Sequence, residues 1–122
     1  MRSQYTFEKK EHYLLLVISG VYDKLDFLSY PLKIMGECEK EAVNKVLIDG
    51  LALKGTDLST LDRFFVGEAV ASTLGNQVKI AVAWPGIDIN KLFENVAVNR
   101  GCRVCVLDSV EAAKDWLLDS NS

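Results

Sequence analysis

Cysteine, histidine and proline are scarce in this chain of 122 residues, which has three cysteines, one histidine and two prolines. A small, odd number of cysteines beside 49% hydrophobic residues argues against a disulfide-stapled secreted scaffold, because a core of this size needs no staples. A single histidine leaves no histidine pair to bind a metal. We therefore expect a protein of the reducing cytoplasm that has no metal site and no cofactor.

Runs of one charge sign and long apolar runs are also missing. The 14 basic and 17 acidic residues give a net charge of −3, and the basic residues are scattered along the chain. Neither a nucleic-acid footprint nor attraction to an anionic membrane is expected. No apolar run reaches the roughly 18 residues of a membrane span, and residues 1–10 carry charge throughout, so we expect neither membrane insertion nor export.

The glycines do not form a phosphate-binding motif. Gly50, Gly55 and Gly101 stand at expected loop positions, but none belongs to a GxGxxG pattern or to a phosphate loop with Lys and Ser or Thr. The single histidine, His12, falls in a polar connection far from any serine or cysteine at a helix start. Nucleotide binding and nucleophilic catalysis therefore have no signature here.

Four carboxylates gather along one part of the chain, at Asp49, Asp57, Asp62 and Glu68. Such residues could form a general acid–base pair, but helix capping and surface solvation explain them more often. We predict no catalytic residues, and an enzyme of unrecognised type stays a third alternative.

One pair of cysteines has CxxC spacing, Cys102 and Cys105. In a strand these Cα atoms lie about 10 Å apart with side chains on opposite faces. That separation exceeds disulfide reach, so we predict two structural cysteines.

The first half of the chain predicts a β-hairpin followed by a helix. Strands are expected over residues 5–8 and 13–19, the second with a continuous apolar run. A helix over residues 26–42 has the acidic Asp26 available as its N-cap. Pro31 removes a backbone donor, so we expect either a kink or a helix proper that starts near Ser29.

The second half alternates strand and helix. The longest helix, over residues 60–74, begins at a capping box of Ser59 and Asp62 and ends at Gly75. The other expected elements are a strand over 45–49, a loop over 51–58, a strand over 78–84, a helix over 90–99, a strand over 102–107, a helix capped by Ser109, and a polar tail over 119–122.

This order, ββαβαβαβα, predicts the fold class. Right-handed crossovers between alternating strands and helices give a mixed, mostly parallel sheet of about five strands with four helices packed against it. We expect a single α/β domain over residues 1–122, with no repeat or linker.

The helix over residues 60–74 carries two apolar arcs. One arc must cover the sheet, and the other packs on a neighbouring helix or meets a second copy of the chain. The first arc contains Leu61, Phe64, Phe65 and Ala69, and the second, expected to be a dimer or helix-packing face, contains Val66, Val70 and Leu74. Arg63 and Glu68 border these arcs and could fix the register of such a contact.

Over nearly its whole length the chain resembles the STAS family, which includes bacterial anti-sigma-factor antagonists. The segments that carry the resemblance are Val46-Leu47-Ile48-Asp49, Asp57-Leu58-Ser59-Thr60-Leu61, Lys79-Ile80-Ala81-Val82, Lys91-Leu92-Phe93 and Ser109-Val110-Glu111-Ala112-Ala113. The resemblance implies the STAS fold and a small, stand-alone, non-enzymatic regulator.

The motif most typical of the family, Asp-Ser-Ser-Gly-Leu, aligns with Asp57-Leu58-Ser59-Thr60-Leu61. In the antagonists a partner kinase phosphorylates the first serine, whose place is taken here by Leu58, and leucine cannot accept phosphate. The glycine of the motif is Thr60. A switch would therefore use Ser59 or Thr60, where phosphate meets free N–H groups at the helix N-terminus.

The resemblance also implies a partner-binding surface at the loop and helix start after the third strand. The residues expected there are Thr56, Asp57, Leu58, Ser59, Thr60, Leu61 and Phe64. The alternative is a small-molecule carrier or sensor, because related domains bind nucleotides or lipids and a pocket could open beside Trp84. A ligand retained on purification would favour this alternative.

Overall fold

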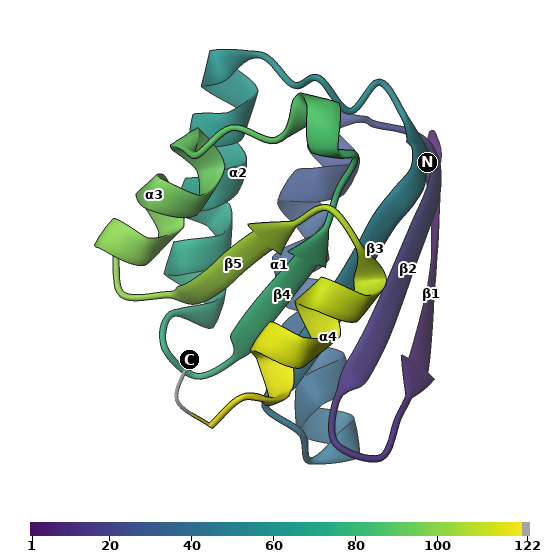
Figure 1. The fold of residues 1–122 in the computed structure, drawn as a ribbon, viewed down its shortest axis with the longest axis vertical. Helices are drawn as coiled ribbons and strands as arrows, with labels where there is room; N and C mark the ends of the chain where they lie inside the picture. The colour runs from purple at the N-terminus through teal and green to yellow at the C-terminus, as the bar shows by residue number, and fades with distance from the viewer. Residues whose placement is uncertain (121–122) are drawn as a thin grey trace.

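The computed structural model describes residues 1–120 (Figure 1). The described elements are β1 (Ser3–Lys9), β2 (Leu14–Val21), α1 (Lys24–Glu41), β3 (Lys45–Lys54), α2 (Thr60–Leu74), β4 (Lys79–Ala83), the short 3-10 helix η1 (Gly86–Asp88), α3 (Leu92–Asn99), β5 (Arg103–Leu107) and α4 (Val110–Leu118). The predicted order, ββαβαβαβα, and the α/β fold class are confirmed.

The five strands lie in the sheet in the same order as in the chain, β1-β2-β3-β4-β5. β1 is antiparallel to β2, and every later pair is parallel. Right-handed crossovers that always step in one direction place their helices on one face of the sheet. α1, α2 and α3 therefore share a face, whereas α4 follows the last strand and covers the other (Figure 1).

Each face of the sheet builds its own apolar core. The side with α1, α2 and α3 contains the larger cluster, in which Leu16, Ile34 and Leu74 are at most 2% exposed. The α4 side contains a smaller cluster of Tyr13, Leu47, Ala81, Ala83, Ala113 and Leu117. Small alanines on β4 let α4 approach the sheet closely.

The start of α1 differs from the sequence prediction. The N-cap is Asp23, whose side chain accepts a hydrogen bond from the Asp26 N–H. The Asp26 carboxylate instead accepts from the Ser3 N–H at 2.9 Å, the Ser3 Oγ at 2.8 Å and the Arg2 N–H at 3.1 Å. These hydrogen bonds, that from the Ser3 N–H foremost, lower the pKa of Asp26. Pro31 lies inside the helix, so the helix start near Ser29 was wrong.

β3 is longer than predicted, because the chain stays extended past Gly50 to Lys54. Only β2 pairs with this second half, across a register shift between Val17 and Ser19. Gly50 is required by packing: a Cβ there would lie 2.7 Å from ring atoms of Trp84. The glycine therefore marks the close approach of an indole ring and not the end of the strand.

The α4 side is closed by a buried lysine. Lys79, 2% exposed, donates from Nζ to the backbone oxygens of Trp116 at 3.1 Å and Asp119 at 2.9 Å, at the C-terminal end of α4. Burial lowers the pKa of Lys79. Asp119 in the expected polar tail is thus tied to the fold, and the tail's last residues, 121–122, lie outside the described residues.

The cysteines are free thiols. Cys102 is buried directly before β5, and Cys105 is half-buried within it. Burial raises the pKa of both thiols, so neither is an activated nucleophile.

Candidate functional site

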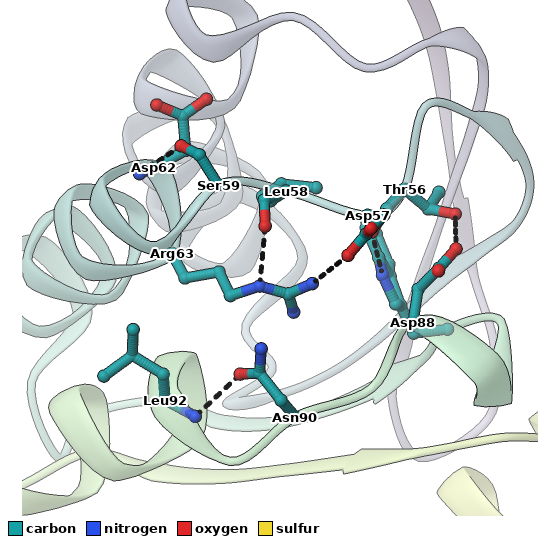
Figure 2. Close-up of polar contacts among 10 residues, drawn as sticks. Thr56, Asp57, Leu58, Ser59, Asp62, Arg63, Asp88, Asn90 and Leu92 are labelled. Carbon is teal, nitrogen blue, oxygen red and sulfur yellow. Dashed lines mark hydrogen bonds and ion pairs between the residues drawn. The ribbon is translucent and has the colours of Figure 1, made fainter.

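The loop over residues 55–59 joins β3 to α2 at the edge of the sheet where the parallel strands end. Thr56 fixes the loop from the inside. Its Oγ1 donates to Asp88 of η1 at 2.6 Å, and its backbone oxygen accepts from Trp84 Nε1 at 3.0 Å (Figure 2). The loop is thereby tied to the segment that follows β4.

Arg63, in the first turn of α2, holds the same loop from the helix side. Its side chain is 7% exposed, and Nε donates to the Leu58 oxygen at 2.9 Å. Nη2 contacts Asp57 Oδ1 at 3.2 Å, and the side chain of Asp57 is 84% exposed (Figure 2). A buried guanidinium thus orients an exposed carboxylate.

The predicted Ser59 cap of α2 is confirmed, but the Asp62 carboxylate bonds to Tyr22 and not back to the Ser59 N–H as in a full capping box. Ser59 Oγ accepts from the Asp62 N–H at 3.1 Å, and Asp62 Oδ2 accepts from the Tyr22 hydroxyl at 3.0 Å. Burial, and then the hydrogen bond to Asp62, raise the pKa of Tyr22, so this hydroxyl stays protonated. Ser59 and Thr60 are both exposed.

Apolar side chains are exposed beside this loop. Leu61 and Phe65 on α2 are 65% and 40% exposed, and Lys24 Nζ of α1 lies 4.7 Å from the centre of the Phe65 ring. Leu25 at the start of α1 and Ile87 in η1 are also exposed. We call these four residues, Leu25, Leu61, Phe65 and Ile87, the docking face.

The predicted partner-binding residues divide into two groups. Asp57, Ser59, Thr60 and Leu61 are exposed. Thr56 is 6% exposed, so it positions the loop and cannot contact a partner directly. Leu58 and Phe64 are half-buried; Leu58 packs against the main core and Phe64 lies under the guanidinium of Arg100.

The second predicted arc of α2 faces the sheet. Val66, Val70 and Leu74 are 7%, 7% and 0% exposed and belong to the main core. Of the two alternatives for this arc, packing within the chain is borne out, and a dimer face is wrong because the surface of these residues is already covered. Glu68 is half-exposed and pairs with Arg100 at 3.1 Å.

A cavity of about 80 Å³ lies between the sheet and the helices α1, α2 and α3. The rings of Tyr30 and Trp84 line it, as do Leu58, Arg63 and Asn90 near the loop. Apolar side chains make up most of the remaining wall: Ile18, Phe27, Pro31, Ile34, Ile48, Val66, Val70, Val82, Ile89, Phe93 and Val106.

Sequence reasoning missed several of these residues. Asp88 and Asn90 follow β4 and reach the loop only in the folded chain. The sequence presents Leu25 and Ile87 as ordinary helix and loop residues, and no sequence signal predicts their exposure. Arg63 was considered only as a surface contact, although it is one of the few buried charges among residues 1–120.

Over residues 1–120, no group of His, Cys, Asp or Glu side chains is arranged to hold a metal ion. Within the same residues, no helix is both long and apolar enough to cross a membrane.

Comparison with known proteins finds no matching family model and no matching curated protein. Among solved structures, an anti-sigma factor antagonist from Mycobacterium paratuberculosis matches with a TM-score of 0.65. The match covers 96% of this chain and 95% of that one, at 14% sequence identity. The chain has the fold of an anti-sigma factor antagonist. The resemblance predicted from the sequence is thus confirmed for the fold.

Proposed function

We propose that this chain is a non-enzymatic regulatory module of the cytoplasm that docks a protein partner through the docking face and the adjoining residues Asp57, Ser59 and Thr60. The supporting observation is a loop held from inside by Thr56 and Arg63, beside exposed apolar side chains. The antagonist fold is consistent with a regulatory role.

The anchoring of the loop favours binding. Thr56 is hydrogen-bonded on both its hydroxyl and its backbone oxygen, and Arg63 fixes the Leu58 oxygen. A surface held in one conformation loses less entropy when a partner binds. Leu61 and Phe65 then offer apolar contacts, and Asp57 offers a charge that can set the partner's orientation.

Ser59 and Thr60 are the proposed phosphoacceptors of a switch on this surface. Both are exposed, and Leu58, which replaces the phosphorylated serine of the family motif, points its side chain toward the core. A phosphate at Ser59 would add negative charge at the positive end of α2 and next to Asp57 and Asp62. The surface presented to a partner would change in charge while the fold stays intact.

The test of docking uses a matched pair of exposed leucines. Leu61→Lys changes the docking face, whereas Leu32→Lys changes an equally exposed leucine in the middle of α1, at 71% exposure. We expect a protein captured quantitatively from source cells by wild type and by Leu32→Lys to be lost with Leu61→Lys. Equal capture by all three proteins would refute the proposed surface, and self-association lost only with Leu61→Lys would identify a second copy as the partner.

The switch is tested by phosphosite mapping of protein isolated from the source cells and by Ser59→Asp. We expect phosphate on Ser59 or Thr60, and a partner affinity that changes at least tenfold with Ser59→Asp. Ser72→Asp, at an exposed serine further along α2, is the control. Phosphate absent from both sites, together with unchanged affinity, would contradict the switch and leave the docking proposal to its own test.

A further inference from the structure

We propose that the cavity between α1, α2, α3 and the sheet is a binding site for a small apolar carboxylate, with the hydrocarbon part inside the cavity and the carboxylate on Arg63 and Asn90. The ligand would lie in the interior of the domain, whereas the docking face lies on its surface.

The size and wall of the cavity indicate an apolar guest. Its volume, about 80 Å³, is several times the roughly 10–15 Å³ that one water molecule needs by the same measure. Ile34, Val70 and Val82 from three different elements line it, and apolar cavities can accept small hydrophobic molecules. A few methylene groups would fill it.

The polar atoms of the two amphipathic rings in the wall are engaged elsewhere. The Tyr30 hydroxyl is hydrogen-bonded to Ser3 Oγ, and Trp84 Nε1 donates to the Thr56 oxygen. Neither ring therefore has a free N–H or O–H donor to offer a water molecule inside the cavity. Only a molecule with an apolar body gains free energy by entering it.

The polar end of the cavity is built from two donors. Arg63 uses Nε and Nη2 for the Leu58 oxygen and Asp57, and within residues 1–120 its other N–H groups have no partner. Asn90 accepts from the Leu92 N–H through Oδ1, and Figure 2 shows its amide nitrogen pointing toward the Arg63 guanidinium. An oxygen placed between these two groups would accept from both.

The charge at this end selects an anion. The guanidinium of Arg63 is buried, while its partner Asp57 is largely in water and so neutralises it only weakly. A planar carboxylate matches the fork of N–H groups on arginine. The chemistry of the two ends therefore points to one molecule, a short-chain carboxylic acid in its ionised form.

The experiment is an NMR titration of the methyl-labelled protein with hexanoate and, separately, with 1-hexanol at neutral pH. We expect hexanoate to shift the methyl signals of Ile34, Val66, Val70 and Val82 and to leave those of Leu117 unchanged. We also expect hexanoate to bind about tenfold more tightly than hexanol, the size of one charge-assisted hydrogen bond. No shift with either compound, or equal shifts on both sides of the sheet, would overturn the site.

Two pairs of variants separate the parts of the proposal. Val70→Phe fills the cavity and should abolish binding, whereas Val98→Phe, which adds the same ring at an exposed position of α3, should keep it. Should Val70→Phe fail to fold, the pattern of shifted methyl signals in the wild type decides whether the ligand lies in the cavity.

Asn90→Leu and Arg63→Met test the position of the carboxylate. Both should lower the affinity for hexanoate to that for hexanol, and an unchanged preference for hexanoate over hexanol in both variants would refute the carboxylate position.

Discussion

Side chains fill the space on the two faces of the sheet to different degrees. On the α4 side, a small cluster is fully buried: Ala81, Ala83, Ala113 and Leu117 are all 0% exposed. Lys79 Nζ donates hydrogen bonds to backbone oxygens at the C-terminal end of α4. The side with three helices has the larger core, yet it holds a cavity of about 80 Å³ and adjoins the exposed loop.

This difference separates a tightly packed side of the sheet from a side that has room for another molecule. The closed side has little room to rearrange, since each added methylene group must displace a neighbour. On the three-helix side, the side chains of the helices and of the sheet meet without filling the space between them. The proposed ligand and the proposed partner both belong to this less completely packed side.

A matched pair of truncations is the strongest test of whether the α4 side of the sheet is packed more tightly than the three-helix side. Leu117→Ala on the closed side and Ile34→Ala beside the cavity remove the same number of carbon atoms from side chains at most 2% exposed. Both should lower the free energy of unfolding by about 2–5 kcal/mol. We expect the larger loss for Leu117→Ala, because Ile34 already borders empty space and makes fewer contacts.

Urea unfolding followed by tryptophan fluorescence measures both losses. A greater loss for Ile34→Ala than for Leu117→Ala would mean that the cavity side carries the tighter packing. The α4 side would then not be the more tightly packed side of the sheet.

Removing the buried charge at the end of α4 should have the next largest effect. Lys79→Met leaves the backbone oxygens of Trp116 and Asp119 without the lysine donor, and should lower the free energy of unfolding by about 1–3 kcal/mol. Lys114→Met, at an exposed position on the same helix, is the control and should change stability by less than about 0.5 kcal/mol. Equal effects of the two variants would show that Lys79 does not hold α4 in place.

Larger side chains on each side of the sheet test the same difference in packing. Ala113→Val should destabilise the closed side by about 1–3 kcal/mol through overpacking. Val70→Ile, beside the cavity, should be neutral or stabilise by up to about 0.8 kcal/mol, the value of one buried methylene group. Thermal unfolding of the two variants gives the sign of each change, and a loss of stability in Val70→Ile would indicate that the cavity wall cannot accept a larger side chain.

The smallest expected effect is a dependence of stability on acid. The pKa of Asp26 in the folded chain lies below its ordinary value of 3.8, so its contribution is complete above that pH and is lost as the pH falls through the folded pKa. Asp26→Asn should therefore be less stable than wild type at pH 6, and the gap should narrow below about pH 4. A difference in the free energy of unfolding between the two proteins that stays constant from pH 6 to pH 3, measured by urea unfolding, would show that Asp26 does not make stability depend on pH.

The sequence predicted elements best where their ends are set by neighbours in the chain. The bounds of α2 follow from the Ser59 cap and from Gly75, both local signals. The start of α1 was misplaced because Asp26, a good cap by type, is hydrogen-bonded by Ser3 of the distant strand β1 and by Arg2 just before it. Hydrogen bonds between distant segments cannot be read from local pattern.

The candidate site was predicted only in part for the same reason. Exposure of Asp57, Ser59 and Leu61 follows from their place at a helix start. The inward position of Thr56 depends on Trp84, and the packing of Trp84 depends on Gly50, which the sequence presented as a strand end. The cavity is the small space that side chains from several elements leave unfilled, and no pattern of residue types in the sequence predicts such a space.

The matching of chain order and sheet order has a consequence for synthesis on the ribosome. Each strand, as it emerges, finds its hydrogen-bonding neighbour already made, because β1 to β5 stand in the sheet as they stand in the chain. The sheet and its first three helices can therefore assemble progressively from the N-terminal end. The opposite face stays bare until α4 arrives, so a nascent chain paused before residue 109 would present Leu47, Ala81 and Ala83 to chaperones.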